Sequence, residues 1–307
     1  FRDPKVVQIF DRYATYNGSS PYKTPGIMSM IPHLEVELGT YFPDGGMEII
    51  TTSLVALAER QGVKFHYNSK VKRIVVKDRK AEGIELADRL LAADLVVSNM
   101  DIFSTYKHLL VDQRKPKRIL NQERSSSALI FYWGVETSFP RLSLHNIMFS
   151  EDYKREFSTI FDQKMVDKDP TIYINISSKC YPSDAPSGME NWFVMINTPG
   201  DFGQDWETII SQAREDIQAK INRILGADIS QVIRTEAILD PRSIASRTMS
   251  HRGSLYGTSS NSKFAAFLRH PNFSRHIKDL YFIGGSVHPG GGIPLCLNSA
   301  KIVSNMI

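Results

Sequence analysis

The sequence predicts a mixed α/β fold, in which an α/β domain is interrupted by a second domain with its own mixed or antiparallel sheet. A helix, a hairpin and a buried strand follow one another in residues 44–101. A central region, about 126–239, contains several strand-like runs and two helical ones. The chain then returns to a strand, a glycine-rich loop and a helix in residues 280–307, which is α/β order again.

The composition is that of a folded protein without an evident nucleic-acid partner. Hydrophobic residues make up 42% and charged residues 23%, and the formal charge is only +4. Cys180 and Cys296 lie far apart and outside any Cys/His spacing. We therefore predict no disulfide, no metal site and a reducing compartment. No apolar run approaches the roughly 20 residues that a transmembrane helix needs.

Residues 1–40 are predicted to be largely helical. Asp3 is a suitable N-cap and Pro4 suits the first helical position, and apolar side chains recur at helical spacing through residue 15. Residues 26–38 are apolar, and we expect Pro32 to interrupt their helix. Because both ends of the sequence have helical patterns, we expect the chain to be part of a longer protein.

The block from residue 44 to residue 101 has clear local signals. After the turn Asp44-Gly45-Gly46, an amphipathic helix is predicted to stop at Gly62. Strands are predicted from their apolar and β-branched runs at 63–67, 70–77, 81–86, 89–92 and 94–98. The strands at 70–77 and 81–86 are predicted to form a hairpin, and the strand at 94–98 is predicted to cross a sheet core.

The next region is basic and helical in pattern up to Arg124, and strands then dominate. Strands are predicted at 126–135, 146–149, 171–177, 192–197 and 232–239, and helices at 151–162 and 205–225, with another beginning at Asp240. Aromatic residues and methionines are frequent in this sheet. They are either core or the wall of a tunnel for a long apolar ligand: Phe131, Tyr132, Trp133, Met148, Phe149, Tyr173, Trp192, Phe193 and Met195.

The strongest chemical signal is a strand at 280–284, a loop with five glycines in residues 284–292, and a helix from Pro294. Glycine lets a ligand approach the backbone closely, and a helix N-terminus favours an anionic or electron-rich group. The loop is neither G-x-G-x-x-G nor a P-loop. Cofactor contact is the better interpretation, and a purely structural turn is the alternative.

This stretch, YFIGGSVHPGGGIPLCLNSAK, resembles the C-terminal flavin-binding signature of the phytoene desaturase-type carotenoid desaturases. Four further stretches, which precede it in the sequence, also resemble the family and occur in the family's order: RYATYNGSSPYKTPG, YFPDGGMEII, VKFHYNSKVKRI and ADLVVSNMD. The resemblance thus spans nearly the whole chain.

The resemblance implies an FAD-binding, Rossmann-like domain of the amine oxidase/phytoene desaturase type, interrupted by a substrate domain. The implied units are a substrate- and membrane-contacting segment at 1–40, FAD-binding parts at 41–101 and 276–307, and a substrate-binding domain at 102–275. Family members also carry a G-x-G-x-x-G motif that holds the FAD pyrophosphate. This motif does not occur in the sequence, so we expect the 307 residues alone to bind no FAD and to be inactive.

The resemblance also implies roles for individual residues. Val71 is expected at the adenine, and the Gly284-Gly285-Ser286 turn near the pyrophosphate and ribityl chain. The run Gly291-Gly292-Ile293-Pro294 is expected along the pyrimidine edge of the flavin, where a helix N-terminus would stabilise negative charge. His288 is a candidate acid or base or polar contact, and the alternative is a loop residue that fixes the turn.

The implied activity is the introduction of C=C bonds into a long polyene, with hydride transfer to FAD and quinone or oxygen as the electron acceptor. A carotenoid substrate implies a peripheral position on the inner, cytoplasmic face of the cell membrane. The apolar segment 26–38 and the basic run 107–124 are its candidate contacts.

Three alternatives to phytoene desaturation remain open. SSSALIFYWG and GSLYGTSSNSK resemble the hydroxycarotenoid 3,4-desaturase branch of the family. A second alternative is another flavoprotein of the same fold, such as an amine oxidase or protoporphyrinogen oxidase, although these usually lack HPGGGIP. The third is a non-catalytic carotenoid- or lipid-binding module.

Overall fold

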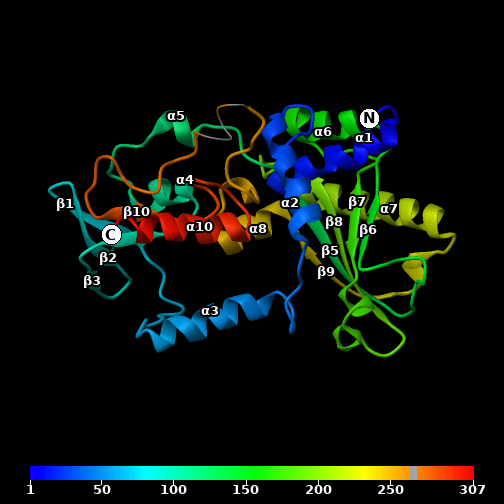
Figure 1. Ribbon diagram of the computed structural model, residues 1–307, viewed down its shortest axis with the longest axis horizontal. Helices are drawn as coiled ribbons and strands as arrows, with labels where there is room; N and C mark the ends of the chain where they lie inside the picture. Colours follow the sequence, from blue (N-terminus) through cyan, green and yellow to red (C-terminus); the bar gives the residue numbers. More distant parts are fainter. Residues whose placement is uncertain (263, 265–267) are drawn as a thin grey trace.

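The computed structural model describes residues 1–262, 264 and 268–307, which form two lobes (Figure 1). The first lobe holds β1–β4, β10 and α10, and the second holds β5–β9 with α1, α6 and α7 (Figure 1). The described helices are α1 (Pro4–Asp11), α2 (Met30–Leu38), α3 (Glu48–Arg60), α4 (Ile102–Ser104), α5 (Lys117–Leu120), α6 (Tyr153–Ser158), α7 (Trp206–Leu225), α8 (Pro241–Thr248) and α10 (Ile293–Ser304). The predicted mixed α/β class is confirmed.

The strands of the described residues form three sheets. They are β1 (Arg73–Lys77), β2 (Lys80–Glu85), β3 (Leu90–Ala92), β4 (Val96–Ser98), β5 (Ser127–Val135), β6 (His145–Met148), β7 (Ile172–Asn175), β8 (Glu190–Thr198), β9 (Ile233–Leu239) and β10 (Leu280–Phe282). Strands β1–β2–β3 form an antiparallel sheet, and β4 pairs in parallel with β10. The second lobe contains the five-stranded order β6–β7–β8–β5–β9, in which all pairs are antiparallel.

The core of the second lobe lies between this five-stranded sheet and α7. Side chains alternate along β5, so that Leu129, Phe131 and Trp133 are buried with Trp206 and Ile217 of α7. Several members of the predicted tunnel set are therefore core residues. The other face of the sheet carries Tyr132, Tyr173, Phe193 and Met195, as the strand register requires. Phe193 packs edge-on against Tyr132 and Tyr173, with ring centroids 5.5 and 6.2 Å apart.

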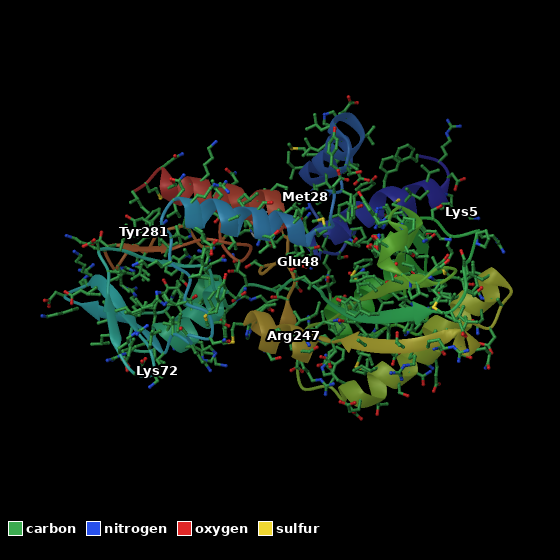
Figure 2. All side chains as sticks on the ribbon, turned by 90° about the horizontal axis from the view of Figure 1, so that it is seen from below. Lys5, Met28, Glu48, Lys72, Arg247 and Tyr281 are labelled. Atoms are coloured by element: carbon green, nitrogen blue, oxygen red, sulfur yellow. The ribbon has the colours of Figure 1, made fainter. Side chains whose placement is uncertain are left out.

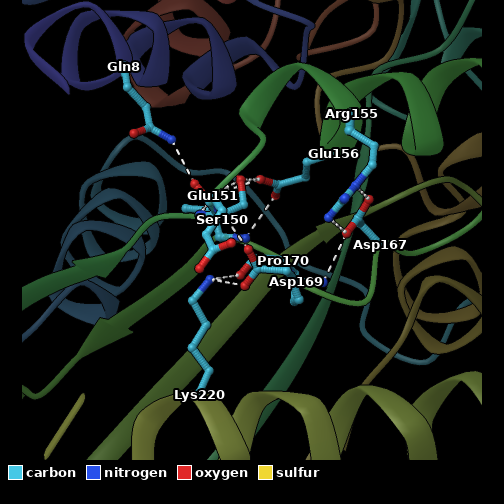
Figure 3. A network of polar contacts seen from close by, with 10 residues as sticks. Gln8, Ser150, Glu151, Arg155, Glu156, Asp167, Asp169, Pro170 and Lys220 are labelled. Carbon is cyan, nitrogen blue, oxygen red and sulfur yellow. Dashed lines mark hydrogen bonds and ion pairs between the residues drawn. The ribbon is translucent and has the colours of Figure 1, made fainter. Parts of the chain in front are cut away.

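A polar network fixes the helices and loops around this lobe (Figure 3). The carboxylate of Glu156 is almost fully buried and accepts hydrogen bonds from Ser150 and Thr171, while burial raises its pKa. Lys220 of α7 donates to Asp169 at 2.7 Å, and Gln8 of α1 donates to the Ser150 carbonyl at 3.0 Å. Because its members bond one another, the network holds the scaffold together.

The predicted strand at 63–67 is wrong, because these residues have no regular structure. Val63 and Tyr67 are 49% and 71% exposed, and a strand forms only where a neighbouring strand pairs with it. The predicted break at Pro32 is also wrong. Pro32 lies in the first turn of α2, where a backbone N–H has no intrahelical partner to lose.

The basic run 107–124 is less helical than its pattern indicates. It contains the end of a π-helical turn, Thr105–Leu109, and the single short helix α5. Lys115 and Pro116 interrupt it, and the non-helical backbone of Pro116 precedes α5. Within the described residues, no helix has both the length and the apolar character that crossing a bilayer requires.

Candidate functional site

The glycine-rich loop follows β10 at the same sheet edge where a second loop follows β4. The register pairs Leu280 with Val96 and Phe282 with Ser98, so both strands end at this edge. Ligands of open α/β sheets bind outside the carboxyl ends of parallel strands. Ser286 in the first loop accepts a hydrogen bond from the Ile102 N–H, 2.9 Å away, at the start of α4. The two loops are therefore joined.

Four of the loop glycines pack closely against other parts of the chain. A Cβ at Gly284, whose φ is +98°, would collide with the Asn99 side chain. A Cβ at Gly291 would lie 2.8 Å from the Tyr256 ring, and one at Gly285 would lie 3.2 Å from the Gly291 Cα. Gly290 similarly faces Arg269 at 3.1 Å. The absence of side chains at these positions thus shapes the loop itself, as in the structural-turn alternative.

Gly292 differs from the other four. With φ at +109° it is the N-cap of α10, and an added Cβ would have no described atom within 4 Å. The next side chains along α10 are apolar and open: Ile293 is 48% exposed and Leu297 is 50% exposed. The N-terminus of α10 therefore opens onto an apolar, unobstructed surface, where its free N–H groups could meet a planar ligand.

Asn272 and Ser299 hold this arrangement in place, and sequence reasoning singled out neither residue. Asn272 is buried, and its side-chain amide donates to the carbonyls of Phe282 and His288 at 3.1 and 2.8 Å. It also donates to Ser299 Oγ at 2.9 Å, and that oxygen accepts from the Gly284 N–H at 3.1 Å. One buried amide thus connects β10, the loop and α10.

His288 contributes to these contacts through its backbone only, and Val71 lies outside them. The side chain of His288 is exposed, while its N–H donates to the His270 carbonyl at 2.9 Å and its carbonyl accepts from Asn272. Its backbone therefore fixes the turn. Val71 is half-buried and lies two residues before β1, whose sheet is at the far end of the lobe (Figure 1). The ligand contacts expected of both residues stay predictions.

A second feature that sequence reasoning missed is a cavity of about 430 Å³ between the two lobes. Arg124, in the segment that leads into β5, lines it together with Phe103, Phe202 and His251. The His251 ring stacks on Phe103 with centroids 3.6 Å apart, and the Arg124 guanidinium lies 5.6 Å from the centre of the same ring.

The charges around this cavity are mainly positive. Burial lowers the pKa of Arg124; the nearby Asp101 raises it and Arg252 lowers it further. The pKa of His251 is lowered to about 4, first by burial and then by Arg124, Arg252 and Lys107. His251 is therefore neutral at physiological pH, while the guanidinium beside it stays charged.

Comparison with known proteins identifies the family. A model of the flavin-containing amine oxidoreductases matches residues 1–307, the whole chain. The chain belongs to this family. The resemblance to carotenoid desaturases is confirmed as well, because the chain is 58% identical over its full length to a 1-hydroxycarotenoid 3,4-desaturase of Flavobacterium sp. (strain P99-3). It is 30% identical over its full length to a phytoene desaturase of Fusarium fujikuroi.

The chain is shorter than these relatives. It covers 63% of the Flavobacterium protein and 58% of the Fusarium protein. The fold also matches that of an oxidoreductase from Methanosarcina mazei, with a TM-score of 0.65 at 16% identity, covering 99% of this chain and 65% of that one. The last comparison supports the fold alone.

The residues present fit the flavin that the family contains. The N-terminus of α10 offers N–H groups beside Gly292, which leaves space for a flat ring, and beside the exposed Ile293. Buried glycine contacts and the Asn272 amide hold the loop rigidly behind it. Gly291, Gly292, Ile293 and Pro294 would meet the ring system. The Ser286 hydroxyl oxygen already accepts a hydrogen bond from the Ile102 N–H, and its O–H remains able to donate.

Proposed function

We propose that this protein is an FAD-dependent carotenoid desaturase that forms the 3,4 double bond of a carotenoid with a hydroxyl group on C1. The observation that carries the proposal is the difference in identity among relatives. Identity to the 1-hydroxycarotenoid 3,4-desaturase is 58%, against 30% to the phytoene desaturase, and both comparisons span the whole chain. The proposal thus favours the hydroxycarotenoid branch over phytoene itself.

The reaction removes one hydrogen from each of two neighbouring carbons and forms a C=C bond between them. When bound, FAD accepts one hydrogen as a hydride, and the other leaves as a proton. The chain's contribution is to position the reacting groups and to exclude water from them. The N-terminus of α10 would stabilise negative charge at the pyrimidine edge, and the rigid loop would hold the ring against the substrate.

The second lobe offers an apolar wall for a long polyene. The face of its sheet turned away from α7 carries the aromatic side chains of Tyr132, Tyr173 and Phe193, and Tyr132 is 43% exposed. Apolar and aromatic side chains are the usual lining of such sites.

We also propose that the protein reaches its substrate at the inner face of the cell membrane, with quinone or oxygen as the electron acceptor. Helix α2 projects from the body of the molecule (Figure 2), and its Met30, Val36 and Leu38 are 53%, 75% and 65% exposed. Around α5, basic side chains line a hollow of about 1320 Å³. They include Arg114, Lys115, Lys117 and Arg118. Apolar contact beside basic charge favours an anionic leaflet.

Expression of the complete gene in cells that accumulate a 1-hydroxycarotenoid tests the activity. We expect a pigment that has lost two hydrogens and absorbs at longer wavelength, because the new double bond extends the conjugated system. Parallel cells that accumulate phytoene should show little conversion. Conversion of phytoene alone would move the assignment to the phytoene branch, and no conversion of either carotenoid would favour a non-catalytic module.

A further inference from the structure

The buried side chain of Arg124 has donors without acceptors. It is 8% exposed, and Nε, Nη1 and Nη2 all lack a hydrogen-bond partner among the described residues. Oδ2 of Asp101 forms an ion pair with Nη1 at 3.7 Å, a distance too long for a hydrogen bond. The charge is therefore paired, but burying guanidinium N–H donors without acceptors is unfavourable. The site is therefore suited to a ligand that brings an oxygen acceptor.

Polar and apolar side chains both line the cavity that contains Arg124. Ser125, Ser126 and His251 line it with Arg124, as do the charged Glu123, Lys164 and Arg252, while Leu120, Ile160, Phe161 and Phe202 supply apolar surface. This combination suits an apolar chain that ends in a single polar group. A pure hydrocarbon would leave the guanidinium donors unpaired.

The cavity adjoins the loop expected at the flavin. The Tyr256 N–H donates to Ser125 Oγ at 2.9 Å, and the Tyr256 ring is what a Cβ at Gly291 would meet at 2.8 Å. Ser125 lines the cavity, and Gly291 begins the run that would meet the ring. A single residue, Tyr256, therefore separates the cavity wall from the candidate flavin surface.

We propose that Arg124 is a specificity-determining residue that donates a hydrogen bond to the C1 hydroxyl oxygen of the substrate, while His251 accepts a hydrogen bond from the same hydroxyl. This inference rests on the proposed function. In a 1-hydroxycarotenoid, a single carbon separates C1 from C3, so the hydroxyl must lie close to the bond that is desaturated. A group that recognises the hydroxyl must consequently lie near the flavin. Arg124 lines the cavity that Tyr256 separates from the candidate flavin surface.

The two side chains complement the two halves of a hydroxyl group. Arg124 has only donors, and the hydroxyl oxygen can accept from it. His251 is neutral because its pKa is lowered to about 4, and one nitrogen of a neutral imidazole accepts a hydrogen bond. Sites built to bind a substrate hydroxyl discriminate strongly against the analogue that lacks it.

The substitution Arg124→Met tests this in the full-length, flavin-loaded protein. We would measure Kd for a 1-hydroxycarotenoid and for the same carotenoid without the hydroxyl, and kcat/KM for the first. The variant should weaken binding of the hydroxylated carotenoid and its kcat/KM by roughly 10- to 100-fold, the value of a charge-assisted hydrogen bond. Binding of the unhydroxylated carotenoid should be unchanged. The matched control is Arg247→Met, an exposed arginine on α8 (Figure 2), which should change neither Kd.

An equal loss for both carotenoids, or no loss for either, would overturn the proposal. If Arg124→Met does not fold, Arg124→Lys is measured in its place. Lysine keeps the positive charge but lacks the forked donors of the guanidinium, so we expect a smaller loss of affinity that is again confined to the hydroxylated carotenoid. An equal loss of affinity for both carotenoids in Arg124→Lys would contradict the proposal. Failure of the wild-type protein to desaturate a 1-hydroxycarotenoid would instead contradict the proposed function, and the inference with it.

Discussion

At the scale of single residues, the cavity between the lobes combines groups that a stable core normally avoids. Arg124 is buried without hydrogen bonds, and His251 is held in its neutral form next to it. Both lie against Phe103, so an aromatic ring is the main packing partner of each. Such perturbed groups in a cavity are typical of functional sites.

The lowered pKa of His251 predicts a dependence of stability on pH. The unfolded chain takes up a proton near pH 6.5, whereas folded His251 does so only near 4. Its contribution to the free energy of unfolding is therefore complete above 6.5 and is lost as the pH falls from 6.5 toward 4. Urea unfolding at about pH 7 and about pH 5 should show a larger acid loss in wild type than in His251→Gln.

The control for this experiment is His66→Gln, because His66 is fully on the surface. It should lose stability in parallel with the wild-type protein. If the free energy of unfolding of His251→Gln falls between the two pH values by as much as that of the wild-type protein, the imidazole is not held neutral by its surroundings.

At the scale of elements, the buried amide of Asn272 determines how β10, the glycine loop and α10 fit together. Asn272→Ala would leave two buried carbonyls and the Ser299 hydroxyl without their donor. We expect the free energy of unfolding to fall by about 2–4 kcal/mol. Denaturant titration measures this, with the exposed Asn298→Ala as the control. A loss below about 0.5 kcal/mol would show that the amide is dispensable.

Local patterns predicted those elements whose signals lie within one segment. The long helix α7 has apolar residues at helical spacing and ends at Gly226, which has the left-handed backbone of a helix stop. The glycine loop was likewise recognisable from its own residues. The stretch 63–67 has an equally strong apolar pattern, yet it is not a strand, because strand formation depends on a partner elsewhere in the chain.

The supporting residues of the site were beyond the reach of such patterns. Tyr256 meets Ser125 and Gly291, which are distant in sequence, and Asn272 meets Ser299 from another segment. Their residue types are common, and only the folded chain brings them together. Arg124 is the last residue of the basic run 107–124, which the sequence predicts as a membrane contact. Its burial separates it from Arg114 and Lys117, which line the hollow around α5.

At the scale of the whole molecule, the two lobes divide the proposed task. The first presents a rigid loop and a helix N-terminus suited to flavin, and the second presents an aromatic sheet face suited to a polyene. The cationic cavity lies where they meet, one residue from the loop. The family is established by the match over residues 1–307, and the arrangement supports a flavin-dependent reaction on an apolar chain with one polar end.

The most direct test of this account is a single turnover without oxygen. The full-length, flavin-loaded protein would be mixed anaerobically with a 1-hydroxycarotenoid, while the visible absorbance of the flavin and of the carotenoid is followed. The account predicts that the oxidised flavin band disappears at the rate at which a longer-wavelength polyene appears, one product for each flavin reduced. If the flavin stays oxidised although the protein has bound the carotenoid, the account is contradicted.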